Sequence, residues 1–273
     1  MKKFKKFLKW LLIIILVTVA CLAVGFKIYT HNYYRTDISI TENIKELLSN
    51  DVHSYSNKDG TVFIPQNQKI KAVIVFYPGG KVEYTSYNGL MYELAARGYL
   101  CLLPRMPENL ALLRTDAVDI LTRDYHKMFE EEGDLDWYLA GHSLGGVAAG
   151  VHIGNTLVPA SDAASSSDGV TMLSEYKGLI LCASYPTVDL TGTNLRLLSI
   201  YGSNDKVLDL DKYEESKTLW PGDSKEFIIE GGNHSYFGSY GLQNGDGAPD
   251  ITNYAQITQT ANIIANWVNE DQN

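Results

Sequence analysis

Residues 137–146, with the sequence WYLAGHSLGG, decide the fold of this chain. The apolar segment Trp137–Ala140 has the length of a buried strand, and the segment Leu144–Ile153, rich in small residues, predicts a helix after it. A serine in the pattern G-x-S-x-G between a strand and a helix is typical of a nucleophile elbow, a strained turn that exposes the hydroxyl group. We therefore predict that Ser143 is a nucleophile. The glycines on either side of it are needed because side chains there would collide with the neighbouring strand and helix.

Apolar segments of strand length recur on both sides of this motif. They are Thr61–Ile64, Ala72–Phe76, Tyr99–Leu103, Gly178–Cys182, Leu195–Ile200 and Glu226–Ile229. Helical patterns lie between and after them, at Tyr87–Arg97, at Asp116–Phe129 and in a last helix with Tyr254, Ile257, Ala261, Ile264 and Val268 at steps of three and four. This alternation predicts an α/β fold with a doubly wound, mostly parallel sheet. The short connection between Cys182 and Leu195 leaves no room for a large lid domain.

A serine hydroxyl needs a general base within hydrogen-bond reach. His234 follows the last predicted strand in the loop GGNHS, where it would project from the carboxyl end of the sheet over the elbow. The other histidines are less suitably placed: His142 adjoins the nucleophile on a tight turn, His126 and His152 lie on predicted helices, and His31 and His53 belong to the polar N-terminal region. We predict that His234 is the general base.

The base in turn needs an acid that orients its imidazole ring. Asp205, in the segment YGSNDKV, follows the preceding strand and fits the chain order Ser, Asp, His that elbow-type enzymes use. Asp189, just after an earlier strand, is the alternative. Asp209 and Asp211 are more typical of residues that cap the next helix.

An oxyanion formed during acyl transfer requires two backbone donors. The N–H of Leu144, directly after the nucleophile, is one candidate. The second is expected in the segment PGGK at residues 78–81, where we favour Gly80 and keep Lys81 as the alternative. The paired glycines could instead serve only to make a turn.

Several segments spread over residues 70–245 together resemble the α/β-hydrolase superfamily, and within it a bacterial subgroup of small serine hydrolases. They are FYPGGKVE, ARGYLCLLPRMPENLA, AGHSLGG, ASYP, YGSNDKV and GGNHSYFGSYG. The resemblance implies the α/β-hydrolase fold, a triad of Ser143, His234 and Asp205, and hydrolysis without a metal ion or other cofactor. The N-terminal region and the stretch PASDAASSSD at residues 159–168, which we expect to be a mobile surface loop, lie outside it.

The N-terminal segment has the pattern of a membrane anchor. Residues 10–26 carry no charge and follow five lysines, and this length suffices for a helix to cross a bilayer. The positive-inside rule then places the N-terminus in the cytoplasm and the body on the extracellular side of the cell membrane. A lipoprotein signal that ends at Cys21 and a cleaved signal peptide are the alternatives. All three would export the body.

These observations predict three parts of the chain. Residues 1–27 form a basic tail and membrane anchor, and residues 28–58 a polar stalk with one short helix near Thr41–Leu48. Residues 59–273 form a single catalytic domain, because this length supports one well-buried core.

Composition excludes several function classes. The net charge of −9 combines +6 in residues 1–27 with −15 in the remainder, so the body would be repelled by nucleic acids. The three cysteines lack metal-ligand spacing. Cys101 and Cys182 lie in apolar segments and are expected to be small buried residues.

The prediction that follows is a serine hydrolase that cleaves a carboxylic ester or thioester of a small or lipid-like molecule. Acyl transfer to another acceptor, or cleavage of an amide, would use the same residues. A non-catalytic binding protein on the same fold is a third, less favoured hypothesis, since all three triad residue types are present.

Overall fold

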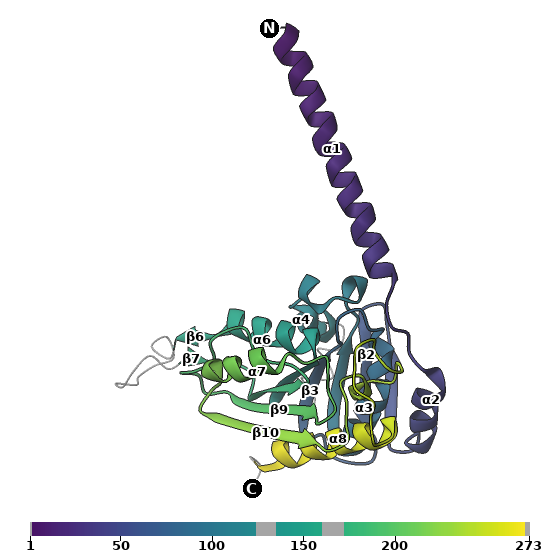
Figure 1. The fold of residues 1–273 in the computed structure, drawn as a ribbon. Coiled ribbons are helices and arrows are strands. Elements are labelled where there is room, and N and C mark those ends of the chain that lie inside the picture. Colours follow the sequence, from purple (N-terminus) through teal and green to yellow (C-terminus); the bar gives the residue numbers. More distant parts are fainter. Residues whose placement is uncertain (1, 124–134, 160–171, 271–273) are drawn as a thin grey trace. The chain divides into compact units, whose positions relative to one another are not determined.

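A computed structural model describes residues 2–123, 135–159 and 172–270 of the chain (Figure 1). It divides into two compact units, Met1–Tyr33 and Tyr34–Asn273. The first unit consists largely of helix α1 (Lys2–His31). The second contains the other helices and strands of the described residues.

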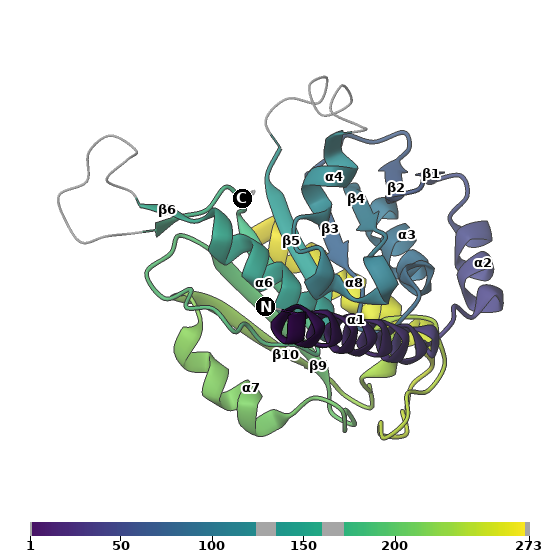
Figure 2. The ribbon, with the colours of Figure 1, turned by 90° about the horizontal axis from the view of Figure 1, so that it is seen from above.

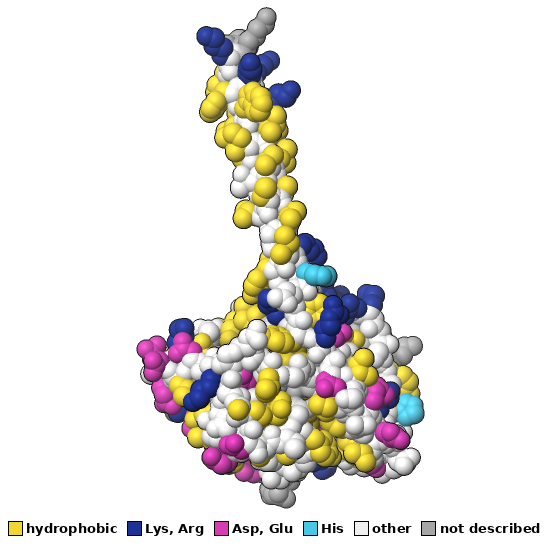
Figure 3. Space-filling model, turned by 45° about the vertical axis from the view of Figure 1, so that its right-hand side comes forward, with side chains coloured by type: hydrophobic (Ala, Val, Ile, Leu, Met, Phe, Trp, Pro, Cys, Tyr) yellow, Lys and Arg dark blue, Asp and Glu magenta, His cyan; other side chains and the backbone are white. Residues whose placement is uncertain are grey.

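Helix α1 carries no charged residue from Trp10 to Phe26. Figure 3 shows hydrophobic side chains along its length and lysines at its amino end. The span Lys3–His31 is long and apolar enough to cross a membrane. Signal sequences share this length and composition, so the helix is weak evidence for membrane anchoring or for export.

The second unit is built on one eight-stranded sheet with the order β1-β2-β4-β3-β5-β8-β9-β10 (Figures 1 and 2). Strand β2 pairs antiparallel with β1 and β4, and all other neighbours in the sheet run parallel. The strands are β1 (Val52–Ser56), β2 (Gly60–Pro65), β3 (Ala72–Tyr77), β4 (Tyr99–Pro104), β5 (Trp137–His142), β8 (Gly178–Cys182), β9 (Arg196–Gly202) and β10 (Asp223–Ile229). A separate two-stranded pair joins β6 (Val158–Pro159) to β7 (Met172–Leu173). The predicted mostly parallel sheet is confirmed.

Helices cover both faces of the sheet (Figure 1). Helices α3 (Asn88–Ala96) and α8 (Asn253–Asn269) pack on one face, and α4 (Ala117–Arg123) and α6 (Leu144–Thr156) on the other. Two further helices are α2 (Ile38–Leu47), which packs against α3, and α7 (Leu210–Ser216), which connects β9 to β10.

Alternate residues of the central strands pack on opposite faces. In β3, Ile74 and Phe76 lie in the core beneath α3 and α8, whereas Val73 and Val75 lie in the core beneath α4 and α6. A strand that is covered on both sides is apolar at every position. This explains why continuous apolar segments predicted the central strands from the sequence.

The sheet begins earlier in the chain than predicted. Residues 52–56, expected to belong to a polar stalk, form the edge strand β1 and pair with β2. Only Val52 of this strand is buried, so the strand lacks the apolar pattern on which the strand predictions depended. The short helix expected near Thr41–Leu48 is α2, whose first turn is capped by Asp37 through a hydrogen bond from the N–H of Ser39.

The predicted helices differ from the observed ones mainly at their ends. Helix α3 follows a short 3₁₀ turn, η1 (Tyr84–Tyr87), and α4 ends at Arg123, beyond which residues 124–134 lie outside the described part of the chain. In α8, Ile257, Ala261, Ile264 and Val268 are buried, but Tyr254 is exposed. Most of the expected loop at residues 159–168 also lies outside the described residues.

Residues 183–195 connect β8 directly to β9 without a helix. No lid domain is inserted at this point, as the short connection predicted.

Candidate active site

The turn between β5 and α6 has the strained geometry of a nucleophile elbow. Ser143 adopts φ 51° and ψ −123°, a region that non-glycine residues occupy only when the surrounding structure imposes it. A Cβ atom at Gly145 would overlap the carbonyl oxygen of Tyr77, and one at Gly141 would overlap the backbone of Gly145. Only glycine fits at these two positions, as the sequence predicted.

The end of β8 supports the elbow. The N–H of Ser143 donates to the carbonyl oxygen of Cys182 at 2.9 Å. Its own carbonyl oxygen accepts a hydrogen bond from Ser184 Oγ at 2.7 Å. Ala183, between these two residues, has φ 48°, so the chain turns sharply here and brings Ser184 to the elbow.

His234 and Asp205 form a buried pair. His234 Nδ1 lies 2.9 Å from Asp205 Oδ2, and the two side chains are 2% and 1% exposed. The other carboxylate oxygen, Oδ1, accepts hydrogen bonds from the N–H groups of Val207 and Leu208, each at 2.8 Å. Both oxygens of Asp205 are therefore held in fixed directions.

The alternative acids lie elsewhere. Asp189 is exposed and accepts hydrogen bonds from the N–H and hydroxyl of Thr191, which lower the pKa of its carboxyl group. Asp209 caps α7 through a hydrogen bond from the N–H of Lys212, as expected, and Asp211 lies in the first turn of that helix. The structure pairs His234 with Asp205 alone among these candidates.

A carboxylate that the sequence analysis did not consider joins the two loops that carry this pair. Asp246 accepts hydrogen bonds from the N–H of His234 at 3.3 Å and from the N–H and hydroxyl of Ser235 at 2.8 and 2.6 Å. It also accepts one from the N–H of Lys206 at 3.4 Å. Its sequence context, NGDG, is typical of any turn, so nothing in the sequence singled it out.

Ser143 and His234 line the same pocket, which has a volume of about 200 Å³. Its other walls are mostly apolar: Leu144, Val147, Ala183, Ser184, Tyr185, Val207, Leu208 and Asp209. His234 Nε2, the ring atom not used by Asp205, is buried without a hydrogen-bond partner among the described residues. The pocket is thus lined by a serine and by a histidine whose Nε2 has no partner within the described part of the chain.

The two predicted oxyanion donors are neighbours. A Cβ atom at Gly80 would lie 2.8 Å from the Leu144 side chain, so the loop after β3 passes directly over the start of α6. The N–H of Lys81, the alternative donor, is already bonded to the carbonyl oxygen of Asn109 at 2.7 Å. Among the described residues, neither Gly80 nor Leu144 has its N–H engaged in this way.

The remaining histidines are placed largely as expected. His142 is fully buried beside the elbow, and His152 lies on α6, where its Nε2 contacts the hydroxyl of Tyr176 at 3.0 Å. His31 ends α1, and His53 lies on the edge strand β1. His126 lies outside the described residues.

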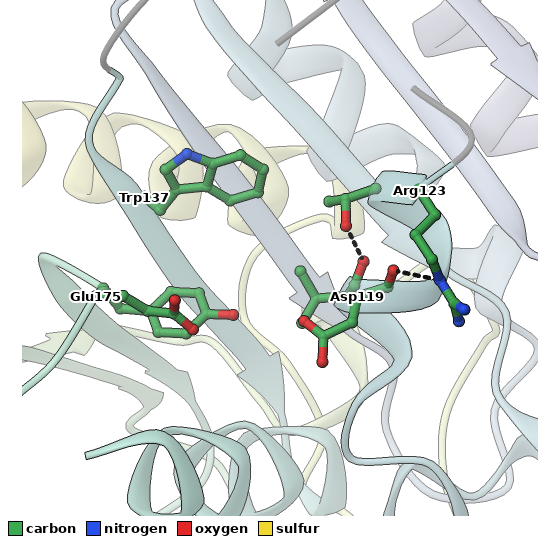
Figure 4. A pocket seen from close by; sticks show the side chains of 7 residues that line it. Asp119, Arg123, Trp137 and Glu175 are labelled. Carbon is green, nitrogen blue, oxygen red and sulfur yellow. Dashed lines mark hydrogen bonds between the residues drawn. The ribbon is translucent and has the colours of Figure 1, made fainter. Parts of the chain in front are cut away.

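A larger cavity of about 400 Å³ lies at the opposite end of the strands, where β5 begins (Figure 4). Figure 4 shows Trp137 and Glu175 on one side of it and Asp119 and Arg123 on the other. The described residues that line it include neither serine nor histidine. In α/β sheets, ligands bind at the carboxyl ends of the strands, where Ser143 lies, so the smaller pocket is the better candidate site.

No cluster of three or more histidine, cysteine or acidic residues that could hold a metal ion occurs within the described ranges. Burial raises the pKa of the Cys101 and Cys182 thiols, so neither is suited to act as a thiolate ligand or nucleophile.

Comparison with known proteins agrees with this arrangement. The sequence profile of the alpha/beta hydrolase family matches residues 73–258, from β3 to the first turns of α8. A comparison with curated proteins gave no match. The match covers more than half of the chain, includes the elbow and both loops of the His234–Asp205 pair, and supports a hydrolase-type function. The chain belongs to the alpha/beta hydrolase family.

Proposed function

We propose that this protein is a serine hydrolase that cleaves a carboxylic ester or thioester through an acyl-enzyme on Ser143. The observation that carries the proposal is that the strained Ser143 lines one pocket together with His234, whose Nδ1 is paired with Asp205. A strained, half-buried serine and an imidazole whose Nε2 has no partner among the described residues supply the groups that nucleophilic acyl transfer requires.

In the first step, Ser143 Oγ attacks the carbonyl carbon of the substrate and its proton passes to His234 Nε2. Asp205 keeps the other nitrogen, Nδ1, protonated and stabilises the imidazolium ion that forms. The N–H groups of Leu144 and Gly80 would donate to the oxyanion, aided by the positive end of the α6 dipole. The bond to the leaving group then breaks, and His234 gives its proton to the departing alcohol or thiol.

In the second step, water attacks the acyl-enzyme and gives a proton to His234. The acyl–oxygen bond to Ser143 breaks, the carboxylic acid leaves, and the proton returns to the serine hydroxyl. The enzyme is restored without any other reactant.

The pocket supports a small acyl group. Its volume of about 200 Å³ is below the roughly 300–1,000 Å³ of pockets that enclose drug-sized ligands. Since a cavity of about 150 Å³ holds one benzene molecule, this pocket accommodates on the order of six to eight non-hydrogen atoms. Its apolar walls favour a short hydrocarbon chain.

The N-terminal helix supports a membrane-tethered form of this enzyme. We propose that α1 anchors the chain with its lysine-rich end in the cytoplasm and residues 34–273 on the other side, because cytoplasmic flanks are enriched in lysine and arginine. The substrate would then be an ester outside the cytoplasm.

The test is covalent labelling of the full chain, in detergent, with a fluorophosphonate probe that reacts with activated serines. We expect labelling of the wild-type protein and its complete loss in Ser143→Ala. The matched control is Ser224→Ala, which removes a serine hydroxyl that bonds the carbonyl oxygen of Pro221 at 2.6 Å, outside the pocket, and should leave the label in place. A folded wild-type protein that resists the probe contradicts the proposal.

The same preparations can be assayed with p-nitrophenyl esters of increasing chain length. We expect kcat/KM to be highest for acyl chains of about two to four carbons and at least roughly tenfold lower for twelve carbons. Equal or rising activity with long chains would contradict the proposed size limit, but not the proposal that Ser143 is the nucleophile. Adding an alcohol acceptor and analysing the products distinguishes hydrolysis from acyl transfer.

A further inference from the structure

A buried tyrosine connects the loop that carries Gly80 to the nucleophile elbow. Tyr87, at the end of η1, is fully buried. Its hydroxyl oxygen accepts a hydrogen bond from the N–H of Gly79 at 3.0 Å and lies 2.8 Å from His142 Nδ1. Gly79 precedes the proposed oxyanion donor, and His142 precedes the proposed nucleophile, so one hydroxyl group joins the two halves of the site.

The direction of these hydrogen bonds follows from the groups present. The N–H of Gly79 can only donate, so the Tyr87 oxygen accepts from it, and the hydroxyl proton is free to be donated to His142 Nδ1. His142 then carries its own proton on Nε2 and is neutral. This is the one arrangement in which Gly79, Tyr87 and His142 Nδ1 are all satisfied.

The surroundings of His142 favour this neutral form. Burial lowers its pKa well below 6.5, and the proximity of His234 lowers it further, although hydrogen bonding to the His234 backbone acts in the opposite direction. The two imidazole rings lie 4.6 Å apart between centroids. A charged His142 would oppose formation of the His234 imidazolium, because like charges at this distance repel strongly in a buried site.

The fit around these groups is close. A Cβ atom at Gly79 would lie 2.7 Å from both His142 Nδ1 and the Tyr87 hydroxyl. No side chain can be placed there without displacing the hydrogen bonds. The first glycine of the PGGK segment is therefore explained by this contact, and the second, Gly80, by its approach to Leu144.

We propose that Tyr87 and His142 are positioning residues that hold the Gly79–Gly80 loop in register with the elbow and so align the oxyanion donors. The inference rests on the proposed acyl-transfer function. Neither side chain lines the pocket that contains Ser143, so both act through the backbone of the loop and through the His234 ring, not on the substrate directly.

The first test is Tyr87→Phe, which removes only the bridging hydroxyl. We expect kcat for a short-chain ester to fall about tenfold while KM stays within about twofold, since the loss affects the transition state more than substrate binding. The inhibition constant of a small alkylboronic acid, which mimics the tetrahedral oxyanion, should rise in parallel. A role confined to stability would lower the melting temperature without changing kcat, KM or the inhibition constant of the boronic acid.

The matched control is Tyr92→Phe. Tyr92 is buried, lies five positions further along, and donates or accepts one hydrogen bond at 2.8 Å with Ser54, on the edge strand β1. Its removal should leave kcat and the boronic acid affinity unchanged. Equal kinetic constants for folded Tyr87→Phe and Tyr92→Phe proteins overturn the inference.

A second pair of variants serves if Tyr87→Phe does not fold. His142→Asn keeps an acceptor near the place of Nδ1, whereas His142→Leu does not. We expect the Asn variant to retain at least about fivefold more kcat than the Leu variant, and equal activities would overturn the inference. A wild-type protein that resists fluorophosphonate labelling would instead overturn the proposed function, so the two failures are distinguishable.

Discussion

His142 shows how one buried residue can affect stability through its protonation state. Its ring contacts Tyr87, His234, Phe237 and Tyr240. The pKa of His142 is lowered in the folded protein, mainly by burial. The unfolded chain therefore binds a proton at this residue below pH about 6.5 that the folded chain does not bind.

This difference predicts a pH-dependent loss of stability. As the pH falls below about 6.5, His142 should lower the free energy of unfolding by up to about 1.4 kcal/mol per pH unit. Asparagine in the variant His142→Asn cannot take up a proton. Between pH 7 and pH 5, the unfolding free energy of the wild type should therefore fall by about 1–2 kcal/mol relative to that of the variant. Denaturant titrations at several pH values measure it. A constant difference would show that folding does not lower the pKa of His142.

At the scale of the element, two of the four glycines in helix α6, Gly145 and Gly150, have opposite requirements. A Cβ atom at Gly145 would overlap the backbone of the loop after β3, whereas one at Gly150 has its nearest neighbour, the Leu179 side chain, at 3.8 Å. The amino end of the helix must approach the sheet closely to form the elbow, and its middle need not.

We expect Gly145→Ala to prevent folding or to lower the free energy of unfolding by several kcal/mol, because backbone must move to admit the methyl group. Gly150→Ala should instead be neutral or raise it by up to about 1 kcal/mol, since alanine is the better helix former. Chemical denaturation of the two variants compares them within one helix. Similar losses for both would contradict the role assigned to Gly145.

At the scale of the whole molecule, the division into two compact units predicts that residues 34–273 fold without α1. Residues 3–29 of α1 are exposed, so the helix adds little to the core. A chain of residues 34–273 should therefore stay folded and soluble, with unchanged labelling by the fluorophosphonate probe. The full chain should be recovered with membranes and released only by detergent. Loss of folding on truncation, or a full chain found in the soluble fraction, would contradict this prediction.

Much of the fold could be predicted because local patterns report burial. Central strands such as β3 and β5 are covered on both faces and are apolar throughout, and the G-x-S-x-G turn has few backbone solutions. The edge strand β1 was missed for the same reason, since only Val52 of it enters the core. The helix ends were also less well predicted, because fraying and 3₁₀ turns such as η1 leave no periodic signal.

The sequence by itself determined the type of fold, the elbow with its two required glycines, and a short set of candidate residues around Ser143, because each depends on neighbours along the chain. Only the tertiary structure decided that His234 meets Asp205 and not Asp189, that Asp246 joins their loops, and that Tyr87 reaches both Gly79 and His142. These contacts link residues from separate loops. Their partners are selected by how the helices and strands pack, which no local pattern in the chain encodes.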